Sequence, residues 1–135
     1  MGVGRILTSS ITQRVRYAET DGMGVVYYAN YLIWFEVGRN DLFRHIGLPY
    51  AEVESRGIYV PVSEVRCRIL LPARYDDEIT VHTSIREVRS RKMVLEYRIE
   101  RDRLLLAEGE TTHICLNAEQ RVTTMPEWMN AKLRD

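Results

Sequence analysis

The most informative part of the chain is residues 17–31, which read Tyr17-Ala-Glu-Thr-Asp-Gly-Met-Gly-Val-Val-Tyr-Tyr-Ala-Asn-Tyr31. Residues 11–17, which lead into it, alternate between apolar and polar positions and predict a first strand. The acid pair and two glycines of residues 19–24 predict a tight loop. From about Tyr28 the apolar residues follow helical spacing, so the stretch predicts a strand, an acidic glycine loop and the start of a long helix.

The helix expected after this loop has one apolar stripe, formed by Tyr31, Phe35, Leu42 and Ile46. Gly38 lies on the same stripe. Glycine costs about 1 kcal/mol relative to alanine inside a helix, so its presence there indicates close approach to another element. Gly47 and Pro49 end the helix, and a short second helix is expected over residues 49–55.

Beyond residue 57 the apolar pattern has the period of strands. Strands are expected over four segments, residues 60–69, 79–86, 93–100 and 104–116, and a brief helix over residues 126–133. The parity of the first segment switches near Ser63 and Glu64, which predicts a β-bulge. Short turns between the strands favour an antiparallel meander, and the long helix must bury its apolar face against that sheet. The predicted fold class is α+β, with a curved antiparallel sheet wrapped around one long central helix.

Length and composition exclude several classes of protein. The 135 residues are expected to form one domain, 1–135, and 45% of them are apolar, so neither disorder nor a disulfide scaffold is expected. Lys plus Arg and Asp plus Glu are each 19, so the zero net charge gives no sign of a nucleic-acid or membrane-surface partner. The longest apolar run, residues 25–35, is too short for a membrane span, and no secretory signal is found. A cytoplasmic protein is expected.

The cysteines and histidines do not have the spacing of a metal site. Cys67 and Cys115 lie in strand-like runs and are expected to be free core thiols. The histidines, His45, His82 and His113, have no HxH or HxxxH spacing, so no metal is expected. Histidines within strands are expected to be structural.

Asp21 is the candidate for chemistry in the glycine loop. The first turn of the following helix carries free N–H groups and a partial positive charge, which can hold the oxygen of a reacting carbonyl. A carboxylate facing those donors can attack the carbonyl or activate water. An aspartate beside a glycine is also common in ordinary turns, so the residues alone leave both interpretations open.

Residues 16–39 carry a resemblance to a known family. They read Arg16-Tyr17-Ala-Glu-Thr-Asp21-Gly-Met-Gly24-Val-Val-Tyr-Tyr28-Ala-Asn30-Tyr31-Leu-Ile-Trp34-Phe35-Glu36-Val-Gly-Arg39. The stretch resembles the hotdog-fold acyl-CoA thioesterases of the 4-hydroxybenzoyl-CoA thioesterase family, including their Tol-Pal-cluster relatives, and the order of elements agrees over residues 11–116. The resemblance implies the hotdog fold and a dimer that joins two sheets edge to edge, with active sites at the dimer interface. Such dimers often pair, so a homo-oligomer is expected, either this dimer or a homotetramer.

The resemblance also implies roles for individual residues. Asp21 would be the catalytic carboxylate, acting as nucleophile or as general base, and the backbone N–H of Tyr28 would polarise the thioester carbonyl. The side chains of Tyr28 and Tyr31 would line the acyl pocket. Many Tol-Pal-cluster relatives have His at the position of Tyr28, whereas the aromatic-CoA thioesterases have Tyr, so the acyl preference stays open.

The expected reaction is hydrolysis of a small aliphatic or aromatic acyl-CoA to the free acid and CoA, without a metal or redox cofactor. Arg89, Arg91 and Lys92 form a basic turn that suits the phosphates of CoA or, alternatively, plain solvation. Glu36 is expected to pair with Arg39 three residues on, and Glu19 is expected to be solvated. Three alternatives remain: an acyl-carrier protein as thioester donor, a hotdog dehydratase or hydratase, and a protein that binds acyl thioesters without turnover.

Overall fold

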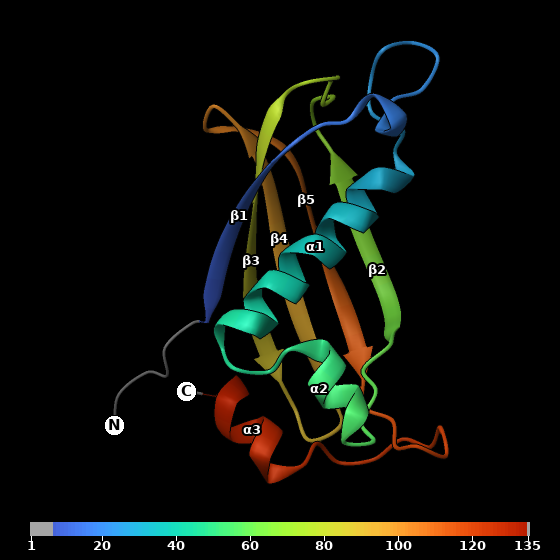
Figure 1. Cartoon of the computed structure of the whole chain (residues 1–135), viewed down its shortest axis with the longest axis vertical. Coiled ribbons are helices and arrows are strands. Elements are labelled where there is room, and N and C mark those ends of the chain that lie inside the picture. Colours follow the sequence, from blue (N-terminus) through green and yellow to red (C-terminus); the bar gives the residue numbers. More distant parts are fainter. Residues whose placement is uncertain (1–6, 135) are drawn as a thin grey trace.

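Five strands form one antiparallel sheet in the computed structural model, which describes residues 7–134. The strands are β1 (Thr8–Arg14), β2 (Val62–Ile69), β3 (Glu78–Val88), β4 (Lys92–Arg101) and β5 (Leu104–Ile114), in the spatial order β1-β3-β4-β5-β2. The helices are α1 (Ala29–His45), α2 (Tyr50–Ser55) and α3 (Glu127–Leu133), and a single 3₁₀ turn covers Tyr17–Glu19. Figure 1 shows α1 lying across one face of the curved sheet, with α2 and α3 at the end where α1 finishes. The predicted α+β hotdog architecture is confirmed.

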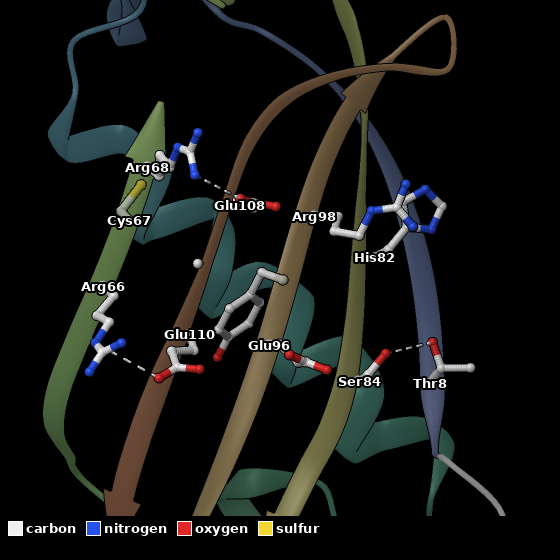
Figure 2. Close-up of a pocket in the computed structure, with 12 residues that line it drawn as sticks. Thr8, Arg66, Cys67, Arg68, His82, Ser84, Glu96, Arg98, Glu108 and Glu110 are labelled. Atoms are coloured by element: carbon white, nitrogen blue, oxygen red, sulfur yellow. Dashed lines mark hydrogen bonds and ion pairs between the residues drawn. The ribbon is translucent and has the colours of Figure 1, made fainter. Parts of the chain in front are cut away.

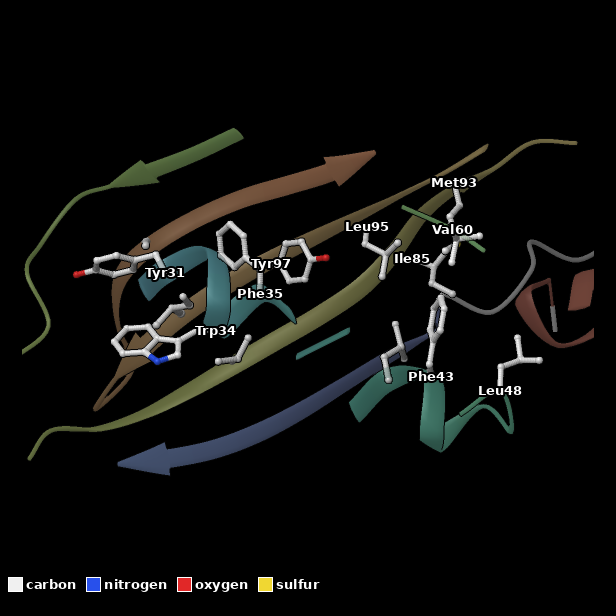
Figure 3. Packing of buried hydrophobic residues seen from close by; sticks show 14 of the residues in the cluster. Tyr31, Trp34, Phe35, Phe43, Leu48, Val60, Ile85, Met93, Leu95 and Tyr97 are labelled. Atoms are coloured by element: carbon white, nitrogen blue, oxygen red, sulfur yellow. The ribbon is translucent and has the colours of Figure 1, made fainter. Parts of the chain in front are cut away.

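The apolar stripe of α1 forms the centre of the core, as predicted. Tyr31, Phe35 and Leu42 are buried, and the ring of Phe35 stacks on Tyr97 of β4 with 4.3 Å between centroids (Figure 3). Gly38 is needed because a Cβ atom there would lie 2.3 Å from Oγ1 of Thr83. The missing side chain therefore lets α1 approach β3 closely.

Two expectations differ from the structure, and a third is confirmed. The first strand is Thr8–Arg14, not residues 11–17, and Tyr17 is 75% exposed in the following turn. The expected bulge is present, as a register shift between Val62 and Glu64. The expectation of a core thiol is correct for Cys115 and wrong for Cys67, which is exposed because its strand lies at the sheet edge.

Strand β2 is exposed along its whole length and has one edge that no other described strand pairs with. All eight of its residues are exposed, although Val65, Cys67 and Ile69 follow the alternation of a half-buried strand. Leu70 and Leu71, which follow it, are also about 40% exposed. An exposed apolar edge strand is unusual in a lone chain, because its free N–H and C=O groups can pair with another strand.

Candidate functional site

Asp21 lies in a short hairpin in front of helix α1. The Asp21 N–H donates to the carbonyl of Val25 at 2.8 Å, and the Tyr27 N–H donates to the carbonyl of Glu19 at 2.9 Å. Gly24 turns the chain with a φ of 83°, a conformation that L side chains rarely adopt. The predicted acidic glycine loop is thus a closed hairpin that ends directly at the helix.

The carboxylate of Asp21 is only half used by this hairpin. Its Oδ1 accepts a hydrogen bond from the N–H of Met23 at 2.7 Å, which fixes the side chain. Within residues 7–134 no donor is bound to the other oxygen, and the residue is partly exposed. The arrangement leaves one fixed, accessible carboxylate oxygen.

Tyr28 marks the start of the helix. It is the N-cap of α1, and among the described residues its N–H donates no hydrogen bond. Its side chain is 65% exposed and lies against Tyr27, with 4.6 Å between ring centroids. Because helix starts concentrate free N–H groups and positive potential, this amide is available to a carbonyl oxygen.

Glu19 holds the hairpin against the helix. It is only 4% exposed, and its carboxylate accepts hydrogen bonds from Trp34 Nε1 and from the Arg16 N–H, both at 2.8 Å. The expectation that Glu19 is solvated is therefore wrong. Sequence reasoning missed it because its partner Trp34 lies fifteen residues further along the chain.

Of the other predicted site residues, Tyr31 lies beside the Asp21 hairpin within the same chain, whereas the basic turn does not. Tyr31 is 1% exposed, and its hydroxyl accepts the N–H of Ala73 at 3.0 Å, so here it is a core residue. Arg89, Arg91 and Lys92 are exposed at the turn between β3 and β4.

That turn lies at the far end of the sheet from the Asp21 hairpin. The hairpin follows the end of β1, where Arg14 pairs with Glu78 at the start of β3 (Figure 1). Strand β3 is 11 residues long and separates the two regions by about 33 Å. The roles of Tyr31 and of the basic turn in substrate binding stay predictions.

A cavity of about 420 Å³ lies between α1, α2 and the sheet, near the same end as the basic turn. Phe43, Val60 and Met93 are buried and form its apolar floor, next to the buried side chain of His113. Polar and charged groups of the two helices complete its lining, namely Glu36, Arg39, Asn40, Arg44 and Tyr50. A mostly apolar cavity with a few polar groups is typical of a binding site for a small molecule.

Arg39 points to the sheet and not to Glu36. No ion pair between Glu36 and Arg39 is found among the described residues, so the predicted pair is not formed. The Arg39 guanidinium lies close enough to Tyr97 to lower the pKa of its hydroxyl, against the raising effect of burial.

His113 is fixed in its neutral form below this cavity. Its Nδ1 lies 2.8 Å from the carbonyl of Val60, and its Nε2 lies 2.8 Å from Oγ1 of Thr111. Burial lowers the pKa of His113 from 6.5 to about 4. The expectation that it is structural agrees with these two bonds.

The opposite face of the sheet has a wider, open hollow (Figure 2). Most of its charged side chains form ion pairs: Arg66 pairs with Glu110 at 3.9 Å, and Arg68 with Glu108 at 3.8 Å. Arg98 pairs with Glu100 next to it. Since these arginines already have carboxylate partners, they are less available to bind a ligand anion than an unpaired arginine would be.

Within residues 7–134, no group of three or more His, Cys, Asp or Glu side chains is placed to hold a metal ion. No described helix is both long and apolar enough to cross a membrane.

Comparison with known proteins identifies the family. The model of the thioesterase-like superfamily matches residues 15–133. The chain belongs to this superfamily. The predicted family is therefore confirmed, and with it the assignment to the thioester hydrolases.

Individual thioesterase-like proteins are similar to this chain over most of their length. A putative acyl-CoA thioesterase of Bacillus subtilis, YneP, is 37% identical over 123 residues, which are 87% of this chain and 89% of that protein. The 4-hydroxybenzoyl-CoA thioesterase of a Pseudomonas strain is 31% identical over 100 residues, 70% of this chain and 71% of that protein. The crystal structure of a hypothetical protein from Thermus thermophilus has a TM-score of 0.90 at 41% identity, and covers 93% of this chain and 96% of that one.

Proposed function

We propose that this protein hydrolyses small aliphatic or aromatic acyl-CoA thioesters to the free acid and CoA. The names of the Bacillus and Pseudomonas relatives support acyl-CoA as the substrate class. The observation that carries the proposal is the fixed Asp21 carboxylate, with one free oxygen, in a hairpin that leads directly to the unpaired N–H of Tyr28. No metal or redox cofactor is required.

The two groups divide the reaction between them. The Tyr28 N–H donates to the thioester oxygen, where negative charge develops as the carbonyl carbon becomes tetrahedral. Asp21 either attacks that carbon, giving a mixed anhydride that water cleaves, or removes a proton from the attacking water. In both routes the C–S bond breaks, CoA leaves as thiolate and takes up a proton, and water supplies the hydroxyl of the acid.

The proposed active site needs a second copy of the chain. The unpaired edge and apolar side chains of β2 support an antiparallel β2–β2 contact that joins two sheets. The start of β2 follows Val60, which lines the cavity. The end of β2 leads to Ala73, which accepts the N–H of Val26 in the Asp21 hairpin.

Antiparallel pairing of two β2 strands would place the start of one beside the end of the other. Each cavity, with the basic turn near it, would then lie next to the Asp21 hairpin of the partner subunit. In this arrangement the acyl group enters the cavity, and Arg89, Arg91 and Lys92 meet the phosphates of CoA. Pairing of such dimers into a homotetramer, and a cytoplasmic location, stay predictions.

Thiol release from a panel of acyl-CoAs tests the catalytic assignment. Asp21→Asn should lower kcat by about 10²–10⁴-fold. Tyr28→Phe keeps the backbone donor and should lose far less. Tyr28→Pro removes that donor at a residue whose φ of −56° already suits proline, and should cost about 10²–10³-fold.

Turnover that survives Asp21→Asn, or that is lost equally in Tyr28→Phe and Tyr28→Pro, would contradict this assignment. If no acyl-CoA releases thiol while the protein is folded, the donor is an acyl-carrier protein or the protein only binds thioesters. Repeating the panel with acyl-carrier protein separates those two cases.

Subunit mixing tests whether the site is shared between chains. Asp21→Asn inactivates one half of the site, and Ala51→Trp fills the cavity that forms the other half. Co-expressed in equal amounts, the two inactive chains should recover about a quarter of native activity, because half of the dimers then hold one intact site of two. A site contained within one chain would give no recovery.

A further inference from the structure

Arg39 is a charged residue of the cavity that neither the core nor the proposed chemistry uses. It is partly buried on the inner side of α1, and it has no carboxylate partner in the described part of the chain. A guanidinium removed from water normally has an anionic partner, because desolvation otherwise opposes its charge. An unpaired arginine in a cavity therefore indicates an anion that the isolated chain lacks.

A chain of hydrogen bonds fixes the groups beneath Arg39. The carbonyl of Val60 can only accept, so His113 Nδ1 carries the proton, and its Nε2 accepts from the Thr111 hydroxyl. The Thr111 oxygen, 2.6 Å from the Tyr97 hydroxyl, must then accept from it. The Tyr97 oxygen is left as an acceptor facing Arg39, which can only donate.

The direction of these bonds leaves Arg39 with donors to spare. A guanidinium has five N–H groups in a planar fork, and one tyrosine oxygen cannot use them all. The charged side chains that line the cavity are Arg39, Arg44 and Glu36, and His113 adds no charge, so positive charge exceeds negative by one. Apart from Asn40 and the neutral His113, the remaining lining is apolar or aromatic.

We infer that Arg39 is a specificity-determining residue that selects acyl-CoAs whose acyl group ends in a carboxylate. The inference rests on the proposed function and names its substrate class. The acyl chain lies along the apolar floor formed by Phe43, Val60 and Met93, and its terminal carboxylate meets the fork of Arg39. A cavity of about 420 Å³ has room for a benzoyl group or a six-carbon chain.

Matched substrate pairs test this inference. Adipyl-CoA is compared with hexanoyl-CoA, and 4-carboxybenzoyl-CoA with 4-methylbenzoyl-CoA, so that each pair differs in the terminal group. A charge-assisted bond to Arg39 should raise kcat/KM for the carboxylated member about 10- to 100-fold. Arg39→Gln should bring this ratio to about one, and Arg39→Lys, which keeps the charge but loses the fork, should give an intermediate ratio.

Binding supplies a readout that does not depend on turnover. In the Asp21→Asn background, the Kd ratio of hexanoyl-CoA to adipyl-CoA should fall about 10- to 100-fold when Arg39→Gln is added. Arg103→Gln, at an exposed turn between β4 and β5, is the matched control and should leave both ratios unchanged.

The outcomes separate this inference from the proposed function. Hydrolysis without preference for the carboxylate would overturn the role of Arg39 and leave the thioesterase assignment intact. If Arg39→Gln lowers kcat/KM equally for both members of a pair, Arg39 pairs with a carboxylate of the second subunit or supports the fold. This result would also overturn the role of Arg39 in selecting the substrate. Failure to hydrolyse any acyl-CoA would instead refute the proposed function.

Discussion

Replacing Glu19 with glutamine should loosen the Asp21 hairpin without changing its shape. The native carboxylate presents two oxygens to two donors, Trp34 Nε1 and the Arg16 N–H, each 2.8 Å away. Glutamine keeps one oxygen and turns an NH₂ group toward the other donor. One bond to a charged acceptor is lost at a site only 4% exposed, which should cost about 1.5–3 kcal/mol of stability.

The same change should also affect turnover, although Glu19 does not touch the substrate. Asp21 lies two residues further along the hairpin that Glu19 anchors, and misplacement of a catalytic group by about 1 Å can cost 10²-fold. We expect kcat for Glu19→Gln to fall by about tenfold or more, with a smaller change in KM.

Urea unfolding followed by circular dichroism, at one fixed protein concentration, measures the loss of stability. Glu119→Gln is the matched control. Glu119 is exposed in a turn, and among the described residues its backbone N–H, and not its carboxylate, makes a hydrogen bond. That control should change stability by less than about 0.5 kcal/mol. If Glu19→Gln is no less stable than Glu119→Gln, the anchoring role of Glu19 is refuted.

Two further predictions concern the core. The pKa of His113 is about 4 in the folded protein and about 6.5 when unfolded, so the unfolded chain binds the extra proton between these values. The contribution of His113 to the free energy of unfolding should be present above about pH 6.5 and lost as the pH falls, so this free energy should fall by about 2 kcal/mol from pH 7 to pH 5. Urea titrations of His113→Gln should show a smaller loss over the same pH range. Gly38→Ala should destabilise by about 1–3 kcal/mol despite the higher helix propensity of alanine, because its Cβ would meet Thr83 Oγ1 at 2.3 Å. The control Gly22→Ala meets no atom within 4 Å, so a Gly38→Ala protein as stable as that control would disprove the close approach.

Features that depend on neighbours in sequence were predictable. The stripe of α1, the close approach at Gly38, the bulge near Ser63 and the turn at Gly24 all follow from periodicity or from backbone conformation, and the structure confirms them. Each is visible within a few neighbouring residues, although Thr83, the partner that Gly38 approaches, lies far along the chain. The Asp21 hairpin belongs to the same group, since two glycines and an Asx turn define it locally.

Features that depend on distant partners were not predictable. Glu19 looked like a solvated loop residue until the fold placed Trp34 beside it. Arg39 has Glu36 three residues before it, yet tertiary packing brings it to Tyr97 of β4 instead. Helical spacing gives the pairs that are possible on an isolated helix, and the sheet decides which of them form.

Strand β2 shows a third case, in which the sequence pattern describes an assembly larger than the chain. The alternation of Val65, Cys67 and Ile69 predicts one buried face, yet all three are exposed in the single chain. Either the pattern is accidental or a second copy supplies the missing cover. The Asp21 hairpin and the cavity lie at opposite ends of β2, so antiparallel pairing of two such strands would bring the hairpin of one chain to the cavity of the other, which supports the second explanation. The mismatch between an apolar pattern and its exposure is therefore a physical argument that the proposed active site is shared between two subunits.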